Sequence, residues 1–136
     1  MRPAVLRLRV PADTASLANH IQRVRSFLAD HHIDQALAHD IPLCVHECCA
    51  NAIQHSGSAA DIDVRVTVDE EAVTVLCADS GSGPEPGHCD PQHPPGLRHS
   101  SGRGLYLMAH LMDEFEMGMD HGTTVRMSKR LNPRPA

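Results

Sequence analysis

Two polar side chains in the middle of the sequence have the types and spacing of a catalytic pair. Glu47 and Asn51 lie four residues apart, and a helix would place both on one face. A carboxylate can act as a general base, and an amide oxygen is a ligand that hard cations accept. The same spacing also occurs on ordinary solvated helix surfaces, so the pair by itself leaves both interpretations open.

The segment that follows an expected strand could admit a ligand close to the backbone. It reads Asp79-Ser80-Gly81-Ser82-Gly83, and its two glycines lack the Cβ atoms that keep a ligand at a distance. The Asp79 carboxylate accepts hydrogen bonds and suits an amino group of a ligand. An ordinary glycine turn is the alternative interpretation. The dinucleotide-binding fingerprint does not match, because no helix opens after this segment and prolines interrupt it.

A second glycine-rich segment is expected at the start of a helix. Residues 101–105 read Ser-Gly-Arg-Gly-Leu. Gly102 and Gly104 leave backbone N–H groups accessible, and Arg103 adds a planar set of donors, which together suit a phosphate group. A flexible helix entry would have the same composition. Thr124, in the Gly-Thr-Thr of the last expected hairpin, offers a hydroxyl group to a ligand.

Hydrophobic periodicity predicts the elements that position these residues. The expected strands are 4–10, 62–68, 73–77, 115–119 and 123–129. The first expected helix is capped by Asp13 or Thr14 and runs to about Asp30, and the other two are 34–55 and 104–113. Pro42 is expected to kink or restart the second helix. Tight turns join most of the strands. The sequence therefore predicts a single α/β domain over residues 1–136, a two-layer sandwich in which helices cover one face of a mixed, mostly antiparallel sheet.

Composition and charge exclude several classes of protein. The 136 residues are 41% hydrophobic and 21% charged, which is typical of a folded domain. Aromatic residues are only 2% of the chain, so the core must be aliphatic. A net charge of −5 argues against direct nucleic-acid binding. Because no membrane-spanning run, signal peptide or disulfide pattern is visible, we expect a cytoplasmic protein with no membrane partner.

The segment 79–101 is a long loop rich in proline, glycine and histidine. A loop of this length in a small domain is either functional or disordered. Its possible metal ligands are His88, Cys89, His93 and His99. Their spacing matches no familiar zinc pattern, so a zinc site is a minor alternative.

The order and spacing of these motifs resemble those of one superfamily. Helical Glu-x-x-x-Asn, strand-Asp-x-Gly-x-Gly, Gly-Arg-Gly-Leu and Gly-Thr-Thr are similar to the four sequence boxes of the histidine-kinase-like (GHKL) ATPases. That superfamily includes gyrase, a heat-shock chaperone and sensor kinases, and the resemblance implies a Bergerat-type ATP-binding fold over about residues 5–130. Val10–Asp13 and Leu105–Glu116 are most similar to the anti-sigma-factor serine-protein kinases of bacterial partner-switching systems.

The resemblance implies a role for each matched residue. Glu47 would be the base that activates an attacking hydroxyl, Asn51 would hold Mg²⁺ between the phosphates of ATP, and Asp79 would receive the adenine amino group. Residues 84–100 would form a lid, although Pro84-Glu85-Pro86 stands where many relatives carry an aromatic or aliphatic residue. The remaining implied ATP contacts are Gly81, Gly83, Gly102, Arg103, Gly104, Leu105 and Thr124.

Two functions fit this resemblance. The first is a Mg·ATP-dependent serine/threonine protein kinase and anti-sigma factor, which phosphorylates an anti-anti-sigma (STAS-type) protein, holds a sigma factor and forms a homodimer. The second is an ATP-binding regulatory module that sequesters a partner without phosphotransfer. Lys129 is the single lysine and lies in no Gly-Lys-Ser/Thr loop, which excludes a P-loop enzyme. A sensor histidine kinase is disfavoured, because the chain has no room for a phosphoacceptor helical hairpin.

Overall fold

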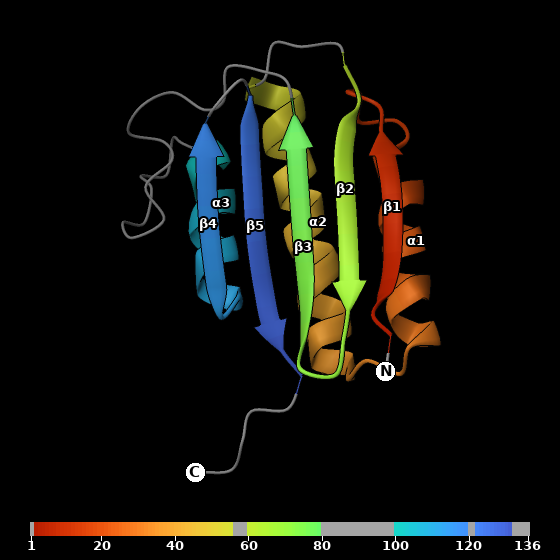
Figure 1. Cartoon of the computed structure of the whole chain (residues 1–136). Helices are drawn as coiled ribbons and strands as arrows, with labels where there is room; N and C mark the ends of the chain where they lie inside the picture. The colour runs from red at the N-terminus through yellow and green to blue at the C-terminus, as the bar shows by residue number, and fades with distance from the viewer. Residues whose placement is uncertain (1, 56–59, 80–99, 120–121, 132–136) are drawn as a thin grey trace.

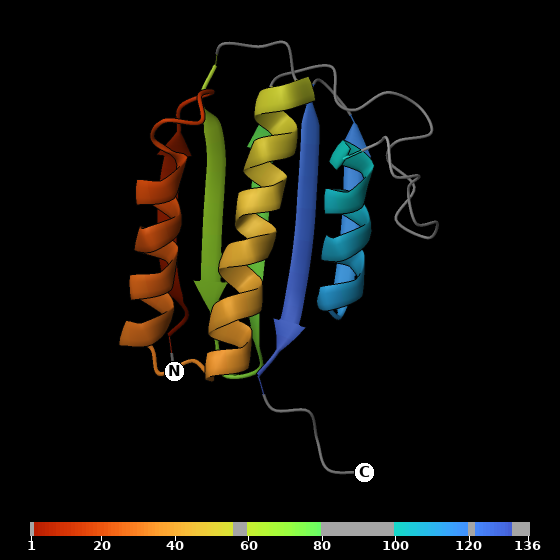
Figure 2. The same cartoon turned by 180° about the vertical axis from the view of Figure 1, so that it is seen from behind.

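The structure is a computed structural model that describes residues 2–55, 60–79, 100–119 and 122–131. These residues form one five-stranded sheet and three helices, and all three helices lie against the same face of the sheet (Figures 1 and 2). The predicted two-layer α/β sandwich is therefore confirmed. The elements are β1 (Ala4–Val10), α1 (Leu17–Asp30), α2 (Gln35–His55), β2 (Ile62–Val68), β3 (Ala72–Asp79), α3 (Ser100–Leu111), β4 (Glu114–Met119) and β5 (Thr123–Arg130).

Every pairing between the described strands is antiparallel, in the order β1-β2-β3-β5-β4. β3 and β4 point in the same direction, but β5 lies between them and runs the opposite way (Figure 1). The expectation of a mostly antiparallel sheet is confirmed. The parallel pair that a mixed sheet would contain does not occur among the described strands, because each strand has neighbours that run the opposite way.

The core is aliphatic, as the scarcity of aromatic residues predicts. Val64 and Val66 of β2 are buried on the helix side of the sheet, and Ile21, Val24 and Leu28 form the buried stripe of α1. Complete burial of such a side chain stabilises the fold by about 1.5–3 kcal/mol relative to exposure. This packing fixes the helices on the sheet, and it thereby fixes the polar side chains that the helices carry.

α2 is one helix, with Pro42 inside it. A proline removes a single backbone hydrogen bond, and the fully buried Ile41 and Val45 on either side hold the helix to the core. The expected restart therefore does not occur. At 21 residues α2 is the longest described helix, and none of the described helices has the length and apolar character that a membrane crossing needs.

α3 begins at Ser100, four residues before the expected start at Gly104. Glycine disfavours a helix interior by about 1 kcal/mol, which is why the sequence pattern placed the boundary later. The buried side chains of Leu105 and Met108 anchor the helix to the core. Gly102 and Gly104 consequently lie within its first turns rather than ahead of it.

Cysteine thiols line the contact between α2 and β3. Cys44, Cys48, Cys49 and Cys77 are all buried and free. Burial, with a contribution from Asp40, raises the pKa of Cys44 to about 12. Hydrogen bonds with Cys48 and Cys49, together with burial, hold the pKa of Cys77 well above its usual range.

We expect these four thiols to resist alkylation in the folded protein. Iodoacetamide reacts with thiolates, and the raised pKa values keep Cys44 and Cys77 protonated at about pH 8. Peptide mapping by mass spectrometry, with and without denaturant, would measure this, and rapid labelling of the folded chain at any of the four would contradict it. The thiols of Cys44 and Cys77 ionise from about pH 9 upward in the unfolded chain, so their protonated burial stabilises the fold below that pH. For Cys44 this stabilisation is lost as the pH rises toward 12.

Candidate functional site

α2 and α3 bring three of the predicted site residues into contact. Gly104 of α3 is buried against α2, and a Cβ atom added to it would lie 2.8 Å from Oε2 of Glu47 and 3.2 Å from Nδ2 of Asn51. Real Cβ contacts are longer than this, so the absence of a side chain at Gly104 is what allows the approach. The helical spacing of Glu47 and Asn51 and the distant glycine motif therefore belong to one site.

The Asn51 side chain has a buried amide nitrogen that lacks a hydrogen-bond partner among the described residues. An unsatisfied buried donor costs about 1–3 kcal/mol, and proteins rarely retain one without a functional reason. The Oδ1 atom of the same amide lies 3.5 Å from the position of the added Cβ at Gly104. The amide thus has unused hydrogen-bonding capacity at the contact between the two helices.

Glu47 combines partial burial with access to solvent. Its side chain is 29% exposed, with Oε2 turned toward Gly104 and Oε1 4.0 Å from Nδ1 of His46. A carboxylate in this position can accept a proton from a ligand and later release it to water. The geometry therefore permits the general-base chemistry that the sequence predicts for this residue.

The ends of β3 and β5 add a second pair of polar residues. Asp79 lies directly opposite Thr123 in the antiparallel register. By strand alternation both residues lie on the helix side of the sheet, in line with the buried Cys77 and Val125. Thr123 is buried, and its Oγ1 atom has no hydrogen-bond partner among the described residues.

The threonine predicted from sequence, Thr124, lies opposite Ala78 and is exposed on the other face of the sheet. The geometry therefore favours its neighbour Thr123, which sequence reasoning missed, as the hydroxyl on the side of Asp79. The alternation of Thr123 with the apolar Val125 and Met127 is the signal that could have identified it.

The other predicted residues divide into two groups. Leu105 is buried in the core, and the backbones of Gly102 and Arg103 lie in the first turn of α3, where N–H groups have no partner within the helix. The predicted residues Gly81 and Gly83 and the possible zinc ligands His88, Cys89, His93 and His99 lie outside the described residues. So does the predicted lid at 84–100, except for Ser100, with which α3 begins.

Lys129 has a structural role at the far end of α3. Its Nζ donates a hydrogen bond of 2.7 Å to the carbonyl oxygen of Leu111, the last residue of that helix. A cation at the C-terminal end of a helix also interacts favourably with the helix dipole. This agrees with the sequence-based exclusion of a phosphate-binding lysine.

The donor set near Gly104 fits a magnesium ion that shares its coordination with a ligand. Mg²⁺ in proteins is commonly held by one or two side-chain oxygens, with phosphates and water supplying the rest. The Oδ1 atom of Asn51, 3.5 Å from the position of an added Cβ at Gly104, is a side-chain oxygen that can take such a role. The buried, unsatisfied amide nitrogen beside it is a donor that suits a phosphate oxygen rather than the metal. Within the described ranges no group of three His, Cys, Asp or Glu residues is arranged to hold a metal by itself.

Comparison with known proteins identifies relatives. The sequence profile of the histidine kinase-like ATPase domain matches residues 10–129. The serine-protein kinase RsbW of Bacillus licheniformis is 36% identical over 104 residues, which cover 68% of this chain and 65% of that protein. RsbW of Bacillus subtilis is 34% identical over 103 residues, which cover 68% of this chain and 64% of that protein. The match thus spans about 65% of the length of these curated relatives.

Solved structures share the fold. A crystal structure of the RsbU and RsbW domains of a Mycobacterium tuberculosis protein superposes with a TM-score of 0.73 and 20% identity, covering 98% of this chain and 34% of that one. A blue-light activated histidine kinase of Erythrobacter litoralis gives a TM-score of 0.59 with 24% identity, covering 85% and 42%. With the profile match over most of its length, the chain belongs to the histidine kinase-like ATPase domain family.

Proposed function

We propose that this chain is a Mg·ATP-dependent serine/threonine protein kinase and anti-sigma factor of a bacterial partner-switching system. Its substrate would be an anti-anti-sigma (STAS-type) protein, and its second partner a sigma factor. The observation that carries the proposal is the approach of Glu47 and Asn51 to Gly104, 2.8 and 3.2 Å from the position of an added Cβ. The RsbW relatives, which are named serine-protein kinases, support the same reaction. By resemblance to that branch, the working form would be a homodimer.

The nucleotide would lie between the ends of β3 and β5 and the start of α3. The Asp79 carboxylate would accept a hydrogen bond from the adenine amino group, with the Thr123 hydroxyl beside it. The free N–H groups in the first turn of α3 would donate to phosphate oxygens. Mg²⁺, held by Asn51 and the phosphates, would neutralise the charge that develops there.

Glu47 would act on the protein substrate. The hydroxyl oxygen of the target serine or threonine forms a bond to the γ-phosphorus of ATP, while the bond from that phosphorus to the β–γ bridging oxygen breaks. ADP leaves with the electron pair of the broken bond, and Glu47 takes the hydroxyl proton. The partial exposure of the Glu47 side chain, 29%, supports this role because a macromolecular substrate must reach it.

The Asp79→Asn variant is expected to bind ATP about 10- to 100-fold more weakly than wild type, because a hydrogen bond to a charged group contributes about 1.5–3 kcal/mol. Isothermal titration of ATP with and without Mg²⁺ measures this. Asp30→Asn makes the same chemical change at an exposed position at the end of α1, and this control should bind ATP as wild type does.

Failure of the folded wild-type chain to bind ATP would overturn the proposed function. Binding that depends on Mg²⁺, together with transfer of phosphate to a STAS-domain protein of the same organism, would support it. Binding without any transfer would instead favour the regulatory module that holds its partner without phosphorylating it.

A further inference from the structure

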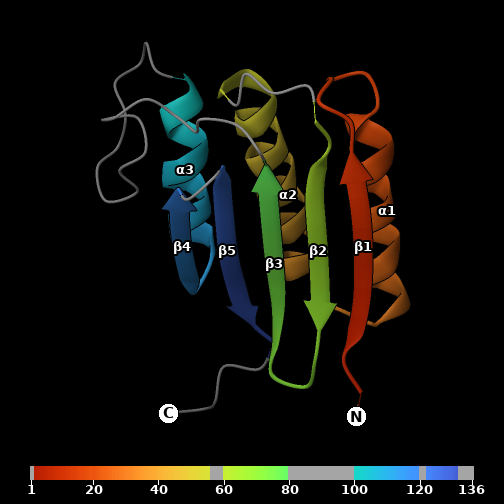
Figure 3. The same ribbon diagram turned by 45° about the horizontal axis from the view of Figure 1, so that its top comes forward.

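The face of the sheet opposite the helices is basic on one side, although the chain as a whole carries a net charge of −5. No described element covers this face (Figures 1 and 3). The exposed residues of β1 and β2 point to it, and they include Arg7, Arg9 and Arg65. Val5, the exposed large hydrophobic residue of the described chain, lies on the same face at 45% exposure. We call this uncovered surface the open sheet face.

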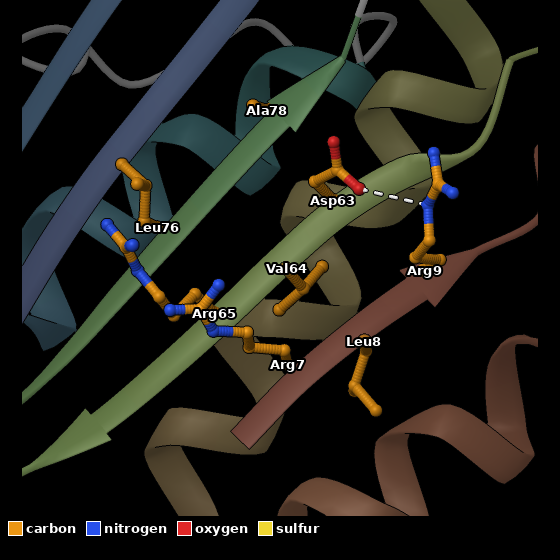
Figure 4. Close-up of a pocket in the computed structure, with 8 residues that line it drawn as sticks. All are labelled: Arg7, Leu8, Arg9, Asp63, Val64, Arg65, Leu76 and Ala78. Atoms are coloured by element: carbon orange, nitrogen blue, oxygen red, sulfur yellow. Dashed lines mark ion pairs between the residues drawn. The ribbon is translucent and has the colours of Figure 1, made fainter. Parts of the chain in front are cut away.

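Two of its arginines lie directly opposite each other. Arg7 of β1 pairs with Arg65 of β2 in the strand register, and Arg65 in turn pairs with Leu76 of β3. Figure 4 shows the two arginine side chains extending in the same direction across the strands toward Leu76. Like charges at directly opposed positions destabilise a sheet, so this arginine pair does not contribute to the stability of the fold.

Two other arginines of the open sheet face have acidic partners. Arg9 forms an ion pair of 3.4 Å with Asp63, and Arg126 forms one of 3.8 Å with Glu114. Among the described residues, no such ion pair is formed by Arg7 or Arg65. On β1 and β2 the positive charge that remains uncompensated is therefore concentrated on one pair of opposed side chains.

The arginine pair borders a shallow depression with an apolar floor. The depression has a volume of about 410 Å³ and is lined by Arg7, Leu8, Arg9, Asp63, Val64, Arg65, Leu76 and Ala78 (Figure 4). A ligand there would meet two guanidinium groups beside the aliphatic surface of Leu76 and Ala78. Guanidinium groups favour carboxylates, with which they form paired hydrogen bonds.

From this geometry we infer that the open sheet face docks an acidic polypeptide segment of a partner protein. Its carboxylates pair with Arg7 and Arg65, and an apolar side chain covers Leu76. A second copy of this chain fits less well. On its own open sheet face Asp63 and Glu114 already form ion pairs, and Glu116 lies directly opposite Arg126 in the strand register. The surface lies on the side of the sheet away from Glu47 and Asn51, so the inference does not depend on the proposed kinase activity.

Selection from a random library of short peptides on the immobilised full chain tests the inference. The selected peptides should be enriched in Asp and Glu and should contain an apolar residue. A selected peptide should bind the Arg7→Glu variant at least about tenfold more weakly, and its affinity for wild type should fall as salt is added. The Arg7→Glu change replaces a repulsive pair by an attractive one, so the melting temperature should hold or rise, which separates lost binding from lost folding.

The matched control is Arg23→Glu, the same charge reversal at an exposed position of α1 on the helix side. It should leave peptide binding within a few-fold of wild type. Selected peptides without acidic enrichment, or equal loss of binding in both variants, would overturn the inference. So would a wild-type dimer that Arg7→Glu dissociates, since the face would then be an interface between copies, and so would preferential binding of RNA or anionic vesicles at this face.

Discussion

The Glu47→Gln variant should transfer phosphate to its protein substrate at least about 100-fold more slowly than wild type, the usual scale of a lost general base. The glutamine keeps the shape of the side chain but cannot take the hydroxyl proton. ATP affinity should stay within a few-fold of wild type, because the adenine and phosphate contacts proposed for Asp79 and α3 are unchanged. Titration calorimetry measures the affinity, and incorporation of radiolabelled phosphate into a STAS-domain protein measures the rate.

Glu116→Gln provides the control, since it makes the same change at an exposed position of β4 on the other side of the sheet. Phosphotransfer by this control should match wild type. A Glu47→Gln protein that retains full phosphotransfer would remove Glu47 from the mechanism while leaving the nucleotide site intact. The two readouts together therefore separate catalysis from binding.

The Gly104→Ala variant should lose phosphotransfer by about 100-fold even though it adds only one methyl group, since a displacement of about 1 Å at a catalytic group can have this effect. The new Cβ would lie 2.8 Å from Oε2 of Glu47, so the flexible end of that side chain must move, and 3.2 Å from the buried amide of Asn51. Alanine also favours a helix over glycine by about 1 kcal/mol. The melting temperature should therefore hold or rise while activity is lost.

Gly118→Ala tests whether the effect belongs to the site. A Cβ at Gly118 of β4 would have no neighbour within 4 Å, so this variant should keep both its phosphotransfer rate and its ATP affinity. A Gly104→Ala protein with normal activity would show that Glu47 and Asn51 can move aside without functional cost. Calorimetry and differential scanning fluorimetry on both variants complete the comparison.

Most of the fold was predictable because its signals are local. The alternation in 62–68 and the helical stripe from Leu17 to Leu28 each lie within one element. The structure reproduces the strand and the end of the helix at Asp30, but α1 begins at Leu17, after Ser16 rather than after the expected caps Asp13 or Thr14. The start of α3 was harder to predict from the sequence, because burial of Leu105 and Met108 overrides the low helix propensity of the glycines before them. In α2, burial of the residues beside Pro42 likewise overrides the low helix propensity of proline.

The residue types of the site were predictable from the sequence, but the contacts between residues of different elements were not. The spacing of Glu47 and Asn51 indicates a shared helix face, but their contact with Gly104 depends on how α2 packs against α3. The choice between Thr123 and Thr124 depends on the β3–β5 register, which local sequence does not specify. The opposition of Arg7 and Arg65 likewise requires two strands that are separated by α1 and α2 in the chain.

The position of β5 has a consequence for the synthesis of the protein. β5 is the last of the described strands in chain order, yet it lies inside the sheet and pairs with both β3 and β4. While the chain is still emerging from the ribosome, β3 has one unpaired edge and Thr123 has not reached Asp79. Exposed strand edges of this kind are prone to aggregation. A translational pause or a premature stop before residue 123 would thus leave an incomplete sheet that needs chaperone protection.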